Sequence, residues 1–129
     1  MSENIGIVVV SHSAMVAESV ALMSEQMSSG SVQVSHCGGN QEGGLGSTVE
    51  GVTQAINKAW SDKGVAIFVD FGSTEMNSKL AKSSFPKDKS GKIVIMNAPL
   101  VEGVITATSI AADGESLEGV RQLLKNMGL

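Results

Sequence analysis

Two short polar segments, each directly after an apolar run, carry the residues best suited to chemistry. Ser11-His12-Ser13 follows the run 5–10, and Asp70 follows the run 65–69. A neutral imidazole nitrogen is a good nucleophile toward phosphorus when its other nitrogen is held as a hydrogen-bond donor. A carboxylate that accepts that N–H fixes the tautomer and stabilises charge developing on the ring. The two segments therefore predict His12 as a phosphate acceptor and Asp70 as the group that orients it.

A phosphoryl group on His12 would lie among small polar residues able to bind its oxygens. The helix expected to begin near Ala14 would direct free N–H groups toward the anion. The candidate phosphate-binding residues are Ser11, Ser13, Gly72 and Ser73. Few lysines or arginines lie nearby in the sequence, so we expect loose binding, which suits onward transfer.

Each of these positions also has a purely structural explanation. A histidine or an aspartate just beyond a strand can cap a turn or pack in a loop, and Ser73 and Thr74 can cap a helix. The adjacent pair His36-Cys37 offers too few ligands for zinc, so we expect no metal site there. No complete dinucleotide fingerprint or phosphate loop is present, and we expect no bound cofactor.

The apolar runs alternate between strand-like and helix-like patterns. This alternation predicts an α/β fold: a doubly wound, mostly parallel four-stranded sheet in the order 2-1-3-4, with helices on both faces. In that order, the crevice beyond the carboxyl ends of the strands lies between the first and third strands, where His12 would face Asp70. We expect a single domain, 1–129. The expected strands are 5–10, 31–35, 65–69 and 93–96, and the expected helices are 14–27, 48–60, 74–83, 100–112 and 117–127.

Three further expectations concern packing. The glycine-rich segment 36–46 is expected to be irregular, and the charged segment 86–92 is expected to be a loop. The seven methionines are interpreted as core residues rather than as a binding surface. The first helix is expected to bury the apolar stripe Val16, Val20, Met23 and Met27.

Composition limits the class of protein. The chain has 129 residues, a net charge of −4, nine scattered basic residues and a single cysteine, Cys37. A nucleic-acid surface needs clustered basic residues and stacking rings, so we expect no nucleic-acid partner. No apolar run approaches membrane-spanning length and no signal peptide is evident, so we expect a cytoplasmic protein without membrane contact.

Three motifs resemble those of a known family. The segment 8–13 resembles the mannose-type enzyme IIA domains of the bacterial phosphoenolpyruvate sugar phosphotransferase system. The segments Asp70-Phe71-Gly72-Ser73 and Ala98-Pro99-Leu100-Val101-Glu102-Gly103 are more similar to the phosphotransferase subunits of dihydroxyacetone kinases. The resemblance extends over essentially the whole chain. One departure is Gly46-Ser47-Thr48, where the family commonly has Gly-Thr-Ser.

The resemblance implies a doubly wound homodimer in which His12 accepts phosphate from the histidine-containing phosphocarrier protein. It further implies that the phosphate passes to ADP held on the nucleotide-binding subunit of the kinase. The carrier itself would then need neither free nucleotide nor metal. The chain ends without a fused donor domain, so the donor is expected to be a separate protein.

Three rival functions are considered. A sugar-transport component would pass phosphate to a IIB protein, and a non-catalytic homologue would only bind a partner. A receiver domain would need an acidic pair after the first strand, where Ser11-His12-Ser13 stands instead, and is rejected. Roles for His36, Cys37, Glu75 and Glu102 are left open, as is any regulatory role of phosphorylation.

Overall fold

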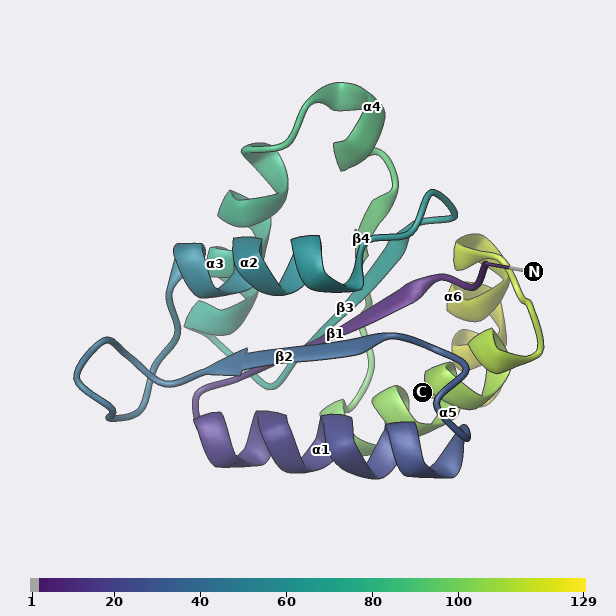
Figure 1. Ribbon diagram of the computed structural model, residues 1–129, viewed down its shortest axis with the longest axis horizontal. Coiled ribbons are helices and arrows are strands. Elements are labelled where there is room, and N and C mark those ends of the chain that lie inside the picture. Colours follow the sequence, from purple (N-terminus) through teal and green to yellow (C-terminus); the bar gives the residue numbers. More distant parts are fainter. Residues whose placement is uncertain (1–2) are drawn as a thin grey trace.

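The computed structural model describes residues 3–129 and contains one parallel sheet between two layers of helices (Figure 1). The sheet order is β2-β1-β3-β4, and all three strand pairs are parallel. The predicted fold class and strand order are confirmed. The strands are β1 (Gly6–Ser11), β2 (Val34–Gly38), β3 (Val65–Val69) and β4 (Ile93–Ile95), and the helices are α1 (Ala14–Met27), α2 (Val49–Ala59), α3 (Ser73–Ser83), α4 (Lys87–Ser90), α5 (Leu100–Ala112) and α6 (Leu117–Asn126).

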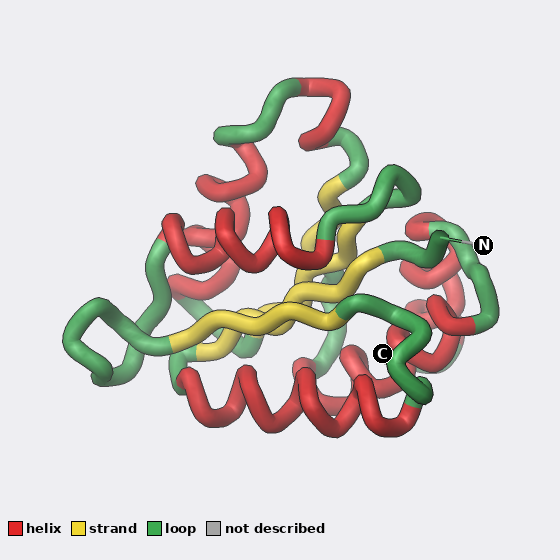
Figure 2. Tube along the Cα trace, in the orientation of Figure 1, coloured by secondary structure: helices red, strands yellow, loops and turns green. Residues whose placement is uncertain are grey.

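The central strand β1 organises the core. All six of its residues are buried, because helices cover both of its faces and strands flank both of its edges. One buried cluster joins one face of the sheet to α1, α5 and α6, and a second joins the other face to α2 and α3. Figure 2 shows the strands running between these two helical layers. The β-branched residues of β1 thus fill positions that are inaccessible to solvent.

The second strand lies further along the chain than expected. We predicted 31–35, but β2 is Val34–Gly38 and includes His36 and Cys37, which we had expected to be irregular. Its register against β1 runs from Ile7 opposite Val34 to Ser11 opposite Gly38. Pairing with β1 keeps this segment extended despite its poor local strand signal.

The first helix buries a different face from the one predicted. Its buried residues are Ala17, Val20, Ala21 and Ser24. By contrast, Val16, Met23 and Met27 are 43%, 42% and 67% exposed. Small residues let the helix approach the sheet and α5 closely, so the larger side chains face outward. The predicted stripe was therefore wrong except at Val20.

Two smaller corrections follow. The segment 86–92, expected to be a loop, contains the single helical turn α4. Among the methionines that the structure describes, only Met96 is buried, so their interpretation as core residues was wrong. Met15, Met27, Met76 and Met127 are each more than half exposed. Met1 lies outside the described residues.

Gly38 allows β2 to end against the segment that follows β1. A Cβ atom built on Gly38 would lie 2.6 Å from the carbonyl oxygen of Ser11 and 2.8 Å from that of Ser13. Both contacts are to backbone, which cannot move aside without shifting the residues on either side of His12.

We predict that Gly38→Ala lowers the free energy of unfolding by roughly 1–3 kcal/mol, the usual cost of overpacking. Urea denaturation measures the change. The matched control is Gly91→Ala, because a Cβ there would meet only the Lys87 carbonyl oxygen at an ordinary 3.5 Å. Equal stability of the two variants would contradict the close contact at Gly38.

Candidate active site

The candidate site lies where β1 and β3 end side by side. His12 directly follows β1, and Asp70 directly follows β3. Because these strands are paired neighbours, the two side chains meet: His12 Nδ1 lies 2.9 Å from Asp70 Oδ1. The two side chains are 20% and 18% exposed, so they remain accessible from one side.

The Asp70 carboxylate is the centre of a hydrogen-bond network. Oδ2 accepts from the backbone N–H of His12 at 2.9 Å and from the Ser11 hydroxyl at 2.8 Å. Oδ1 accepts from the backbone N–H of Phe71 at 2.8 Å, in addition to the His12 ring. The Thr74 hydroxyl lies 3.1 Å from Oδ1 and 2.7 Å from the Phe71 carbonyl oxygen. The carboxylate thus holds both the ring and the backbone of His12.

These hydrogen bonds determine the charge of Asp70. Burial alone would raise its pKa, but hydrogen bonds from the His12 backbone, the Ser11 hydroxyl, the His12 ring and the Phe71 backbone outweigh that effect. They lower the pKa of Asp70 from 3.8 to about 2. The group is therefore a carboxylate at neutral pH. It accepts a hydrogen bond from Nδ1–H of His12 and has no proton of its own to donate.

The tautomer of His12 follows from this network. With Nδ1–H donating to Asp70, Nε2 carries the lone pair. The Ser73 hydroxyl lies 3.2 Å from Nε2 and can donate to it. The ring nitrogen with the free lone pair therefore points away from the carboxylate, toward the start of α3.

The structure separates the predicted phosphate-binding residues into two groups. Ser11 is only 1% exposed and its hydroxyl is directed at Asp70 and away from Nε2, contrary to expectation. Ser13 caps α1, with its side chain accepting from Val16 N–H at 3.3 Å. Gly72 and Ser73 lie on the Nε2 side, at the start of α3.

The turn before α3 depends on Gly72. This residue has φ +57° and ψ −122°, a conformation that side chains other than glycine rarely adopt. It precedes Ser73 directly, and no side chain caps the first turn of α3. The turn therefore brings Ser73 to His12, and the N–H groups of Thr74 and Glu75 bond to backbone carbonyls of the turn rather than to a side-chain cap.

Two residues of the site were missed from the sequence. The Phe71 ring stacks on the His12 ring, with centroids 4.1 Å apart and an angle of 11° between the planes. Thr74, considered only as a helix cap, is fully buried against Asp70 and Phe71. Both stand within the motif that flanks Asp70, but no spacing pattern indicates that they reach His12 or its partner.

The glycine-rich loop 39–48 is attached to the site through its backbone. Gly46 N–H donates to the His12 carbonyl oxygen at 2.9 Å. Ser47 accepts from Asn77 of α3 at 2.8 Å, and Thr48 caps α2 by accepting from Gly51 N–H at 2.9 Å. The two hydroxyls after Gly46 thus have structural partners.

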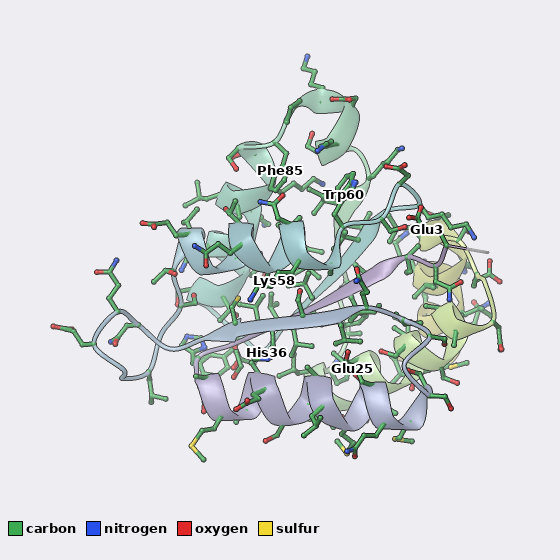
Figure 3. The ribbon with its side chains drawn as sticks, in the orientation of Figure 1. Glu3, Glu25, His36, Lys58, Trp60 and Phe85 are labelled. Carbon is green, nitrogen blue, oxygen red and sulfur yellow. The ribbon has the colours of Figure 1, made fainter. Side chains whose placement is uncertain are left out.

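The residues left open by the sequence lie outside this network. His36 is exposed on the outer strand β2, where it lines a hollow of about 250 Å³ with Glu25 and Lys58 (Figure 3). Burial raises the pKa of Cys37 to about 11, so its thiol stays protonated. Glu75 pairs with Lys79 at 3.4 Å. Within residues 3–129, no three His, Cys, Asp or Glu side chains gather as a metal site would require.

Exposed apolar side chains gather at the edge of the sheet that carries His12. Each belongs to a segment that starts or turns at the carboxyl ends of the strands, and their exposed fractions range from 42% to 78%. We call this set the apolar collar: Met15, Leu45, Phe71, Met76 and Val101. Glu42, Glu75 and Glu102 belong to the same segments, whereas all nine basic residues stand at or after Lys58. Lys79 pairs with Glu75 and lines a hollow with Asp70 and Phe71, so among residues 3–129 the edge is apolar with two unpaired acidic residues, Glu42 and Glu102, on its segments.

Comparisons with known proteins agree with this architecture. The chain belongs to the family described as the PTS system fructose IIA component, EIIA-man, whose model matches residues 6–121. Within that family, its relatives include subunits named DhaM. It is 30% identical over 122 residues to the phosphotransferase subunit DhaM of a PTS-dependent dihydroxyacetone kinase from Lactococcus lactis, covering 95% of this chain and 94% of that protein.

Two further comparisons support the same grouping. The phosphoryl donor subunit DhaM of PEP-dependent dihydroxyacetone kinase 1 from Listeria innocua is 33% identical, with 88% of this chain and 87% of that protein covered. The crystal structure of the unknown function protein EF1359 superposes with a TM-score of 0.83 at 31% identity, covering 96% and 95% of the two chains. The family resemblance predicted from the three motifs is confirmed. None of the helices in the described part of the chain has the length and apolar character needed to cross a membrane.

We predict that Asp70→Asn lowers the free energy of unfolding at neutral pH by roughly 1–3 kcal/mol, as expected for hydrogen bonds to a charged group. Because the folded-state pKa of Asp70 lies below its ordinary value, the carboxylate stabilises the fold above that value. The stabilisation is lost as the pH falls from 3.8 toward about 2. Denaturation of both proteins across this range measures the difference, and a gap that stays constant with pH would contradict it.

Proposed function

We propose that this chain is a phosphoryl carrier that holds phosphate on His12 Nε2 and serves as the phosphoryl-donor subunit of a dihydroxyacetone kinase. The donor is the histidine-containing phosphocarrier protein. The acceptor is ADP bound to the nucleotide-binding subunit of the kinase. The observation that carries the proposal is the 2.9 Å contact between His12 Nδ1 and Asp70 Oδ1, which leaves Nε2 with its lone pair.

Asp70 and Ser11 have different roles in the proposed phosphoryl transfer. Asp70 keeps the Nδ1 proton in place and balances the positive charge that forms on the ring when Nε2 bonds to phosphorus. Ser11 acts through Asp70, because its buried hydroxyl donates to Oδ2. We assign Ser11 to positioning rather than to phosphate binding.

The phosphoryl oxygens are held on the Nε2 side. The Ser73 hydroxyl, now 3.2 Å from Nε2, turns to donate to an oxygen of the phosphoryl group. Gly72 and Ser73 supply the uncapped amino end of α3, and Ser13 stands at the amino end of α1. Two helix termini and hydroxyls bind an anion without a fixed cation, which keeps the phosphate transferable.

The surface around His12 fits a basic protein partner. The apolar collar lies on segments that begin or turn at the carboxyl ends of the strands, its Phe71 stacks on His12, and Glu42 and Glu102 add negative charge to the same segments. A donor with an apolar contact area and basic residues at its border is complementary to this edge. The same surface serves donor and acceptor in turn, because both must reach Nε2.

The kinase role is favoured over the sugar-transport alternative. The Lactococcus and Listeria relatives, at 30% and 33% identity over nearly their whole lengths, are named as dihydroxyacetone kinase subunits.

The family resemblance also carries the expectation of a homodimer, which sedimentation of the purified chain tests.

We predict that His12→Ala abolishes phosphate uptake while the fold is retained, since His12 stands outside both buried clusters. The measurement uses labelled phosphoenolpyruvate, purified enzyme I and the phosphocarrier protein. The label on the wild-type chain is acid-labile and alkali-stable, as for a phosphohistidine. Addition of the kinase subunits with ADP and dihydroxyacetone then discharges it.

The matched control is His36→Ala, which removes the other histidine of the chain and leaves uptake unchanged. Label on the His12→Ala protein would disprove the carrier site. Label on the wild type that the kinase subunits cannot discharge, but a IIB protein can, would favour the sugar-transport alternative.

A second prediction concerns the apolar collar. Met15→Lys places a positive charge at the edge of the site, so we expect the KM for the phosphocarrier protein to rise by roughly 5- to 30-fold, the effect of about 1–2 kcal/mol at an interface. The control is Met27→Lys on the same helix. Met15 and Met27 are 78% and 67% exposed, but Met27 ends α1 at the opposite edge of the sheet. An equal KM for both variants would refute docking at the collar.

A further inference from the structure

The Phe71 ring has a position that folding alone does not explain. Its side chain is 66% exposed, so it contributes little to the core. It nevertheless lies parallel to the His12 ring, at 4.1 Å between centroids and 11° between planes. An exposed phenyl ring held against a nucleophilic imidazole suggests a part in the reaction of that imidazole.

The stacked geometry is built into the backbone. Phe71 N–H donates to Asp70 Oδ1 at 2.8 Å, and the Phe71 carbonyl oxygen accepts from the Thr74 hydroxyl at 2.7 Å. Gly72 then turns the chain with φ +57°. The carboxylate that orients the His12 ring thus also places the Phe71 ring beside it.

We propose that Phe71 is a positioning residue that holds the His12 ring in its reactive orientation and stabilises the positive charge the ring acquires on phosphorylation. The face of a phenyl ring is electron-rich and attracts a cation lying over it. Asp70 therefore stabilises the charged ring through its Nδ1–H edge, and Phe71 stabilises it through one face. This inference rests on the proposed phosphoryl transfer at Nε2.

The charge follows from the atoms exchanged. The Nε2 lone pair forms the bond to phosphorus, while the bond from phosphorus to the donor nitrogen breaks and its electron pair returns to the donor. His12 keeps its Nδ1 proton, so the phosphorylated ring is positively charged. When an oxygen of a nucleoside diphosphate takes the phosphoryl group, the N–P bond breaks and its electron pair returns to Nε2. The ring becomes neutral again.

Phe71 also belongs to the apolar collar, so an effect of its variants on partner docking must be distinguished from an effect on the reaction at His12. Phosphoramidate, a small phosphoryl donor without a protein surface, makes this possible. The variants are Phe71→Leu, which keeps apolar bulk without an aromatic face, and Phe71→Trp, which keeps the face. High exposure at this position leaves room for both side chains, and thermal melting verifies that both variants fold.

With phosphoramidate, we expect His12 in Phe71→Leu to be phosphorylated roughly 3- to 10-fold more slowly than in the wild type, the effect of losing one cation–π contact. Phe71→Trp restores the rate to within about 2-fold. Asp70 contacts the ring, and Glu42, Glu75 and Glu102 stand at the same edge; none of these charged groups is altered in either variant.

Three results would go against the inference, and they are distinguishable. If Phe71→Leu matches the wild type with phosphoramidate but is slower with the phosphocarrier protein, Phe71 only docks the partner. If Phe71→Trp is as slow as Phe71→Leu, the aromatic face has no part. If the wild type takes label from neither donor, the proposed phosphoryl carrier itself fails, and the inference fails with it.

Discussion

The contact between His12 Nδ1 and Asp70 Oδ1 is the interaction on which the rest of the site depends. It joins the ends of β1 and β3, and the parallel pairing of these two strands is what brings the side chains within 2.9 Å. The same carboxylate binds the His12 backbone, the Ser11 hydroxyl and the Phe71 backbone. One charged group therefore fixes the tautomer of the histidine. It also forms hydrogen bonds to the residues where β1 ends and where the turn into α3 begins.

The surroundings of the pair keep Asp70 charged and leave His12 partly exposed. Hydrogen bonds hold the pKa of Asp70 at about 2, so its charge is available at neutral pH. The histidine remains partly exposed, and its second nitrogen meets only the Ser73 hydroxyl among the described side chains. The exposed Phe71 ring stacks on the histidine at this opening. The proposed phosphoryl carrier needs both features. The tautomer of His12 must be fixed before a partner binds, and the docked partner must then cover the exposed side of the ring.

Much of the fold could be predicted from the sequence because its signals are local. The largely β-branched runs 5–10 and 65–69 identify buried strands, and the polar residues directly after them identify the edge where the candidate site lies. The strand order then brings His12 to Asp70 without further information. Ser73 was also placed correctly beside the histidine, since it stands three residues after Asp70 at the start of a helix.

The errors concern features that depend on contacts between distant segments. Strand β2 extends to Gly38 because β1 provides hydrogen-bond partners for it, although His36-Cys37-Gly38 has little strand character of its own. The burial of Ala17 and Ala21 in place of Met23 and Met27 reflects how closely α1 approaches the sheet and α5. The sequence by itself therefore determined the number of strands, their order and the pairing of His12 with Asp70. Only the tertiary structure decided that Ser11 turns to Asp70, that Phe71 stacks on His12 and that most of the described methionines face water, because each depends on the distance between segments far apart in the chain.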